Sequence, residues 1–224
     1  MRKPSSVTSR LLAAGVFAGP LYLLVGLAQA VTRDGFDLTG HSWSLLANGD
    51  SGWIQVANFL VTGLLVLAAA VAVRAVLRGS KGGVWGPVLL GLFGLGLVAS
   101  GVFRADPMNG FPPGAPSGPP DYPTVDGLLH MVAGSIGFVG LIGACLVFAR
   151  RFLAEGRGWW AGYSAATGTL FLAAFVGVGA GSHAGGTTLQ AVTLGFTAAV
   201  VLGWLWVSLV LVQLLTRDSR SDRR

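Results

Sequence analysis

Six long apolar stretches constrain this chain more than any other feature of its sequence. A helix needs roughly 20 residues to cross the ~30 Å hydrocarbon core of a bilayer. Five stretches reach that length without a charged residue, at about residues 11–31, 53–73, 84–103, 159–180 and 187–215. A sixth, at about 125–149, is apolar except for Asp126 and His130 near its start. None alternates in polarity as a barrel strand does. We therefore expect one all-α domain, an integral membrane bundle of six transmembrane helices.

Composition supports this fold class and excludes others. Charged residues make up 11% of the chain and apolar residues 53%, whereas a soluble domain carries about 25% charged residues. The net charge of +6 comes from short basic clusters between apolar stretches. Nucleic-acid binding needs basic residues gathered on one folded surface, so we do not expect it. The single cysteine, Cys145, excludes a disulfide within the chain.

The distribution of basic residues predicts the orientation. Of the 15 Lys and Arg residues, all but Arg33 and Arg104 fall at the termini or in alternate connections. Basic residues collect on the cytoplasmic side, so we expect a plasma-membrane protein with cytoplasmic N- and C-termini. Residues 218–224 then form a basic cytoplasmic tail. Pro20 predicts a kink in the first helix.

A competing interpretation concerns the first stretch, which resembles a secretory signal ending in Ala28-Gln29-Ala30. Its apolar part is longer than the 7–15 residues of a usual signal core. An uncleaved first helix is therefore favoured.

The ionisable and polar residues near helix ends gather on the expected outer side, which also holds all three histidines. Asp126 and His130 are four residues apart, so on a helix their side chains share a face. The carboxylate can orient the imidazole for proton transfer or metal binding, which makes the two residues candidate catalytic groups. The alternative is a hydrogen-bonded pair near a helix start, where an acidic residue also suits the helix dipole.

Further candidates follow from the same outer cluster. The expected ligand-binding residues are Ser44, Gln55, Asn58, Arg104, Asp106 and His183. A zinc site with an open position can be drawn from His130, His183 and Asp106, with His41 as a fourth ligand. These residues come from separate segments, and none of them has the sequence spacing typical of metal ligands. We therefore assign no cofactor, and zinc remains the alternative.

Three segments carry a resemblance to a known family. They are Gly35-Phe36-Asp37…His41-Ser42-Trp43-Ser44-Leu45-Leu46…Gly49…Gly52-Trp53-Ile54-Gln55…Asn58-Phe59, Gly101-Val102-Phe103-Arg104-Ala105-Asp106-Pro107, and Gly127…His130. They resemble a prokaryotic family of uncharacterised six-helix membrane proteins, catalogued as domain of unknown function 998 (DUF998). The resemblance covers about residues 10–215. Its motif positions Ser44, Gln55, Asn58, Asp106 and His130 coincide with the outer polar cluster.

Three functions remain open at this level. The first is an outward-facing polar pocket that binds a lipid head group, a small polar ligand or a metal, with hydrolase or transferase activity as an extension. The second is a non-catalytic accessory or scaffold subunit, with a protein partner or a second copy of the chain. The third, a small-solute transporter, needs polar residues through the midplane, which the apolar inner halves of the stretches do not provide.

Overall fold

The computed structural model describes residues 6–181 and 184–221, and for residues 217–221 it describes the backbone only. The helices are α1 (Ser6–Val16), α2 (Ala18–Thr32), the 3₁₀ helix η1 (Trp43–Ala47), α3 (Gly52–Val76), α4 (Trp85–Val102), α5 (Val125–Ala154), α6 (Gly158–Gly181) and α7 (Gly186–Ser221). The described residues contain six helical segments that are long and apolar enough to cross a membrane, with α1 and α2 together forming the first. The all-α, six-span prediction is therefore confirmed.

The first span is broken where the sequence predicts a kink. α1 ends at Val16 and α2 begins at Ala18. Pro20 has no backbone N–H to donate to the carbonyl of Val16, four residues earlier. That carbonyl instead accepts a hydrogen bond of 2.9 Å from the hydroxyl of Ser208 on α7. The proline thus frees a backbone acceptor, and a hydroxyl on the neighbouring helix satisfies it.

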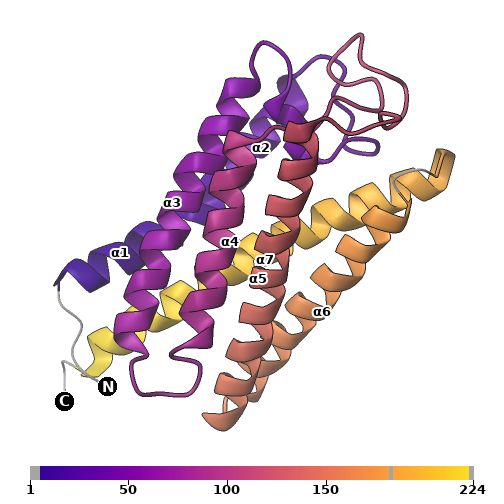
Figure 1. The fold of residues 1–224 in the computed structure, drawn as a ribbon. Coiled ribbons are helices and arrows are strands. Elements are labelled where there is room, and N and C mark those ends of the chain that lie inside the picture. The colour runs from indigo at the N-terminus through magenta and orange to yellow at the C-terminus, as the bar shows by residue number, and fades with distance from the viewer. Residues whose placement is uncertain (1–5, 182–183, 222–224) are drawn as a thin grey trace.

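The six spans form a closed ring in sequence order. Each span packs against the next one along the chain, and the ring closes where α1 and α2 pack against both α3 and α7. Two connections, residues 33–51 and 103–124, lie together at one end of the bundle, which we call the cap end (Figure 1). The opposite end, where the α3–α4 and α5–α6 connections lie, is called the basic end (Figure 1). α1 begins and α7 ends there.

Glycine brings the backbones of the central helices into contact. A Cβ atom on Gly63 of α3 would lie 2.9 Å from the carbonyl oxygen of Gly94 on α4. A Cβ atom on Gly96 would lie 2.6 Å from the Cα of Gly137 on α5. Apolar lipid provides little drive for helices to associate, so close backbone packing through small residues is what holds α3, α4 and α5 together.

The helices extend beyond the apolar stretches at several ends. α5 continues past the expected boundary at 149 to Ala154, with Arg150 and Arg151 in its last turns. The expected tail at 218–224 begins as part of the α7 backbone, which is helical to Ser221, and the remainder lies outside the described residues.

Candidate functional site

The two cap-end connections are joined by hydrogen bonds between them. The Asn48 side chain donates to the backbone carbonyl of Ala105 at 3.0 Å. Arg33 donates to the carbonyls of Leu46, at 3.2 Å, and Asn48, at 2.6 Å, and its guanidinium lies 5.3 Å from the centre of the Phe111 ring. Both connections are therefore fixed over the end of the bundle.

His41 has a structural role in this cap. It is buried. Its Nδ1 accepts the Asp37 backbone N–H at 2.8 Å, and its Nε2–H donates to the Asn109 carbonyl at 2.9 Å. The Asn109 side chain returns a bond of 3.1 Å to the Gly40 carbonyl. Because both ring nitrogens bond backbone groups, His41 links the two connections. It does not line the cavity described next.

Below the cap, inside the ring of helices, lies a cavity of about 930 Å³. Its walls are mostly apolar and come from α2 and every span from α3 to α7. Aromatic side chains contribute much of this wall: Tyr22, Trp43, Phe59, Phe93, Phe138, Phe171, Phe175, Phe196 and Trp204. Met108 and three prolines of the 103–124 connection line its cap side. Along α5, the lining runs from Gly127 to Leu141, a rise of about 21 Å at 1.5 Å per residue.

Polar side chains line the cap side of this cavity. Ser42 and Ser44 lie with their hydroxyl oxygens 3.0 Å apart, within hydrogen-bonding distance. Asp106 accepts two hydrogen bonds from Thr124, one from the backbone N–H at 2.9 Å and one from the hydroxyl at 2.6 Å. Thr124 is the N-cap of α5 and accepts the Gly127 N–H at 3.0 Å. Asp106 is thus held at a helix N-terminus, where a negative charge is favourable.

His130 also lines the cavity, and it is oriented by a backbone carbonyl. Its side chain is buried, and Nδ1–H donates to the Phe103 carbonyl at 2.9 Å. In the neutral ring this bond places the proton on Nδ1 and leaves Nε2 as the acceptor. Asp126, the partner expected from the sequence, is exposed at the start of α5 and does not line the cavity.

Gln55 and Asn58 belong to a buried amide cluster on the α2–α3 side rather than to the cavity lining. The oxygen of Gln55 accepts bonds from the side-chain nitrogens of Gln29, at 2.9 Å, and Asn58, at 3.2 Å. Asn58 also donates to the Tyr22 carbonyl at 3.2 Å. Gln29 was not among the predicted residues, although its position inside an apolar stretch was the available signal.

The remaining candidates lie elsewhere. Arg104 is exposed and does not line the cavity. His183 lies outside the described residues, so the proposed zinc ligands are not all placed. Among the residues that the structure does describe, no group of three His, Cys, Asp or Glu side chains is placed to hold a metal ion.

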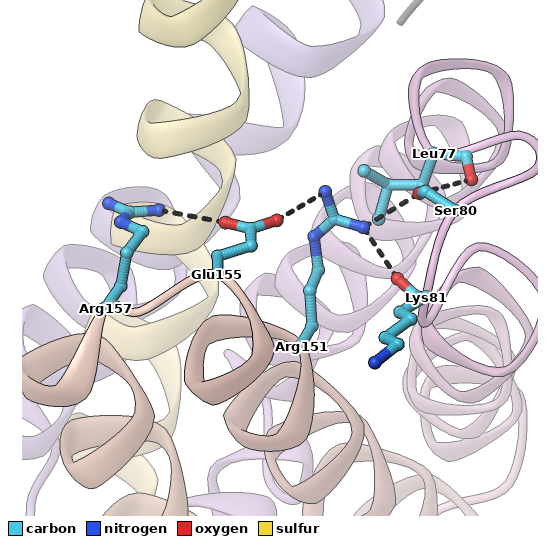
Figure 2. Close-up of polar contacts among 6 residues, drawn as sticks. All are labelled: Leu77, Ser80, Lys81, Arg151, Glu155 and Arg157. Carbon is cyan, nitrogen blue, oxygen red and sulfur yellow. Dashed lines mark hydrogen bonds and ion pairs between the residues drawn. The ribbon is translucent and has the colours of Figure 1, made fainter.

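At the basic end a second polar cluster connects three parts of the chain (Figure 2). The buried Arg151 donates to the Ser80 hydroxyl at 2.8 Å and the Lys81 carbonyl at 2.6 Å, and pairs with Glu155 at 2.7 Å. Glu155 also lies 3.9 Å from Arg157, which donates to Gln213 of α7 at 2.6 Å. All of these bonds are made within the chain. The cluster therefore has a structural role, joining the α3–α4 connection, the end of α5 and α7.

Comparison with known proteins identifies the family. Neither a curated protein nor a solved structure matches the chain. Residues 16–213 match the model of a family described as "Protein of unknown function (DUF998)". The match includes both cap-end connections and all six spans, except that it leaves out residues 6–15 of α1 and residues 214–221 of α7. The chain therefore belongs to the DUF998 family, as the resemblance in its sequence predicted.

Proposed function

We propose that this protein binds a single membrane lipid in the cap-end cavity. The observation that carries the proposal is the polarity of that cavity, which is apolar along its length and polar on its cap side. A lipid has the same distribution of polarity. The volume of about 930 Å³ is at the upper end of the range for pockets that enclose small molecules, about 300–1,000 Å³.

The depth of the cavity fits a hydrocarbon chain that enters from the cap-end surface. Its lining covers about 21 Å of α5, compared with ~30 Å for the whole hydrocarbon core of a bilayer. A chain lying along α5 with its polar end at Ser44 and Asp106 would therefore extend past the bilayer midplane. The deepest lining includes Leu141, Phe171 and Trp204, and no residue of the basic-end cluster lines the cavity.

A lipid also needs a way in, and the lining provides it on the side of α5 and α6. Met131 of α5 and Val176 of α6 both line the cavity, yet 61% and 60% of their surface is exposed. Residues that face the cavity and the bundle exterior together mark an opening toward the bilayer. The end of the α6–α7 pair also lies apart from the cap-end connections (Figure 1).

The proposal includes an orientation, with the basic end in the cytoplasm and the cap end outside the plasma membrane. The basic residues Arg74, Arg78, Lys81 and Arg150 are exposed at the basic end, as the cytoplasmic side of a membrane protein requires. Cysteines introduced at Ser117 and at Gly156, in a Cys145→Ala background, test it in intact cells. An impermeant thiol reagent should label position 117 alone, and labelling of position 156 alone would reverse the orientation.

The binding proposal is tested by filling the cavity. Gly134 of α5 lines it, and a Cβ atom there would approach nothing closer than the Ser100 hydroxyl at 4.0 Å. Gly134→Leu should therefore place a side chain where the lipid lies. Gly162→Leu on α6 is the matched control, because a Cβ atom at Gly162 has no neighbour within 4 Å and Gly162 does not line the cavity.

Native mass spectrometry of the purified protein gives the measurement. Wild type and Gly162→Leu should each carry one lipid per chain. The lipid occupancy of Gly134→Leu should be at least tenfold lower. Equal lipid occupancy in the two glycine variants would refute binding in this cavity. A stoichiometric protein partner in place of the lipid would support the accessory-subunit alternative.

A further inference from the structure

The charges around the polar side of the cavity limit which lipid it can hold, and this step rests on the proposed lipid binding. Among the described residues that line the cavity, Asp106 is the only one with a carboxylate, and no lysine or arginine is present. Phosphate and carboxylate head groups are normally bound by arginine, lysine or backbone N–H groups. This cavity offers an anionic head group no cationic side chain.

The nearest candidates for such a cation are engaged or placed elsewhere. Arg33 donates to the carbonyls of Leu46 and Asn48 and lies over the Phe111 ring. Moving it into the cavity would leave those carbonyls without their donor. Arg104 is exposed and outside the lining. The negative charge of Asp106 is therefore not neutralised by a basic side chain of the lining.

On the cap side of the cavity, Asp106 and His130 offer hydrogen-bond acceptors to a ligand, while the serine and threonine hydroxyls of the lining can donate or accept and the Trp43 indole N–H donates. Each Asp106 oxygen accepts one bond from Thr124 and keeps capacity for another. His130 donates its Nδ1 proton to Phe103, which leaves Nε2 as an acceptor in the neutral ring. In the Ser42–Ser44 pair one hydroxyl donates to the other, so the pair can still donate one proton and accept further bonds.

We propose that the lipid bound in this cavity has a polar end that donates hydrogen bonds and carries no negative charge. That end is an ammonium or a hydroxyl group, as in a long-chain amine or alcohol. A carboxylate or a phosphate would face the like charge of Asp106, which is half-buried at the cap side of the cavity.

Quenching of tryptophan fluorescence tests the proposal with three matched probes. These are an amine, an alcohol and a carboxylic acid that share one 18-carbon chain brominated at its middle. Trp43 and Trp204 line the cavity, so a bromine atom on a bound chain quenches them. Measurements in detergent at pH 8 keep the acid ionised. The amine and the alcohol should bind at least tenfold more tightly than the acid, and a Trp204→Phe variant should lose much of the quenching.

Two variants distinguish the effect of the Asp106 charge from the effect of other negative charges at the cap end. Asp106→Asn keeps an oxygen that accepts a bond from Thr124, and should reduce the advantage of the amine over the acid about tenfold. Asp126→Asn removes an exposed charge outside the lining on the start of α5, and should leave that advantage unchanged. Equal loss in both variants would refute the role given to Asp106.

The possible results distinguish this inference from the proposed function. Tighter binding of the acid than of the amine and the alcohol would overturn the inference and leave lipid binding intact. Absence of quenching by all three probes would overturn both. A preference for the amine over the alcohol would identify an ammonium group as the polar end, and the reverse preference would identify a hydroxyl.

Discussion

Two parts of this bundle use glycine for opposite purposes. In α3, α4 and α5, Gly63 and Gly96 lie against the backbone of the neighbouring helix, so that a Cβ atom would overlap it. In α6, a Cβ atom on Gly162 or Gly177 would have no atom of another helix within 4 Å, although Gly168 of the same helix does lie against Cys145 of α5. The apolar part of α6 has 28% of its residues buried, compared with 50% in those of α3 and α4.

This difference indicates a tightly packed unit and a looser wall. α3, α4 and α5 are held by backbone contact, and the cap connections and the basic-end cluster fasten their ends. The looser wall is α6, whose apolar part is the least buried of the six spans; it packs between α5 and α7 and lines the cavity. A lipid site needs such a wall, because the wall must separate from its neighbour to admit a chain. The predictions below compare the two parts through their stability.

The largest effect is expected at the basic end (Figure 2). Arg151 fastens the α3–α4 connection to α5, whereas Arg157 fastens the start of α6 to α7. Arg151→Gln should lower the free energy of unfolding by about 3 kcal/mol, because it removes a buried guanidinium that donates to the Ser80 hydroxyl and the Lys81 carbonyl. Arg157→Gln should cost less, since Arg157 belongs to the looser part. A larger loss in Arg157→Gln would contradict the division into two parts.

Cys145 provides the measurement for these variants. It is the only cysteine in the chain, it is fully buried, and its Cβ would lie 2.9 Å from a Cβ on Gly168 of α6. A thiol-reactive dye therefore reports unfolding or separation of α5 from α6. The temperature at which labelling becomes fast gives the ranking of the variants.

The two uses of glycine predict opposite changes in stability when the glycine is replaced by alanine. Gly96→Ala should destabilise the protein by about 2 kcal/mol, because the added methyl overlaps the Gly137 backbone. Gly162→Ala should stabilise it by about 0.5–1 kcal/mol, because alanine has the higher helix propensity and meets no neighbour. Loss of stability in both, measured by Cys145 labelling, would show that α6 is packed as tightly as α4.

The spacing of glycines in the sequence did not distinguish these uses. Gly134, Gly137, Gly140 and Gly143 recur every three residues on one helix, which predicts close packing for all four. Gly137 and Gly140 do approach α4, with Cβ positions 3.2 Å from the Gly96 Cα and 2.7 Å from the Leu89 carbonyl. Gly134 faces the cavity instead. Which face of a helix meets a neighbour depends on the tilt of both helices, which a uniformly apolar stretch does not encode.

The same limit applies to the candidate site. Apolar length and the positions of polar residues predicted six spans and singled out Ser44, Asp106 and His130, which line one cavity. The sequence also placed Gln55 in that site, but its partners are Gln29 and Asn58. The aromatic wall was missed, because aromatic residues in an apolar helix look alike whether they face lipid, a neighbour or a cavity.

A smaller effect is expected from the cap, which belongs to the tight part. His41→Ala removes both hydrogen bonds between this side chain and backbone groups of the two connections. It should lower the free energy of unfolding by about 1.5 kcal/mol, since buried backbone groups then lose their partners. His41→Ala also removes the ring contact between His41 and Phe36. A smaller effect in Phe36→Leu would assign the loss of stability to the hydrogen bonds. Unchanged Cys145 labelling in His41→Ala would show that the cap does not fasten the bundle.

The smallest effect is a pH dependence in the same connection. Hydrogen bonds from the Thr39 backbone N–H and hydroxyl, both 2.8 Å, hold the pKa of Asp37 below its usual range. A carboxyl whose pKa is lower in the folded state stabilises that state above its unfolded pKa of about 3.9, and the contribution is lost as pH falls through the folded pKa.

Asp37 is exposed, so Asp37→Asn should cost less than about 1 kcal/mol near neutral pH. The stability difference between wild type and Asp37→Asn should stay constant from pH 7 to about 5 and shrink below about 4. A difference that grows on acidification would mean that Asp37 stabilises the cap as the protonated group, and would place its pKa on the other side of the usual value.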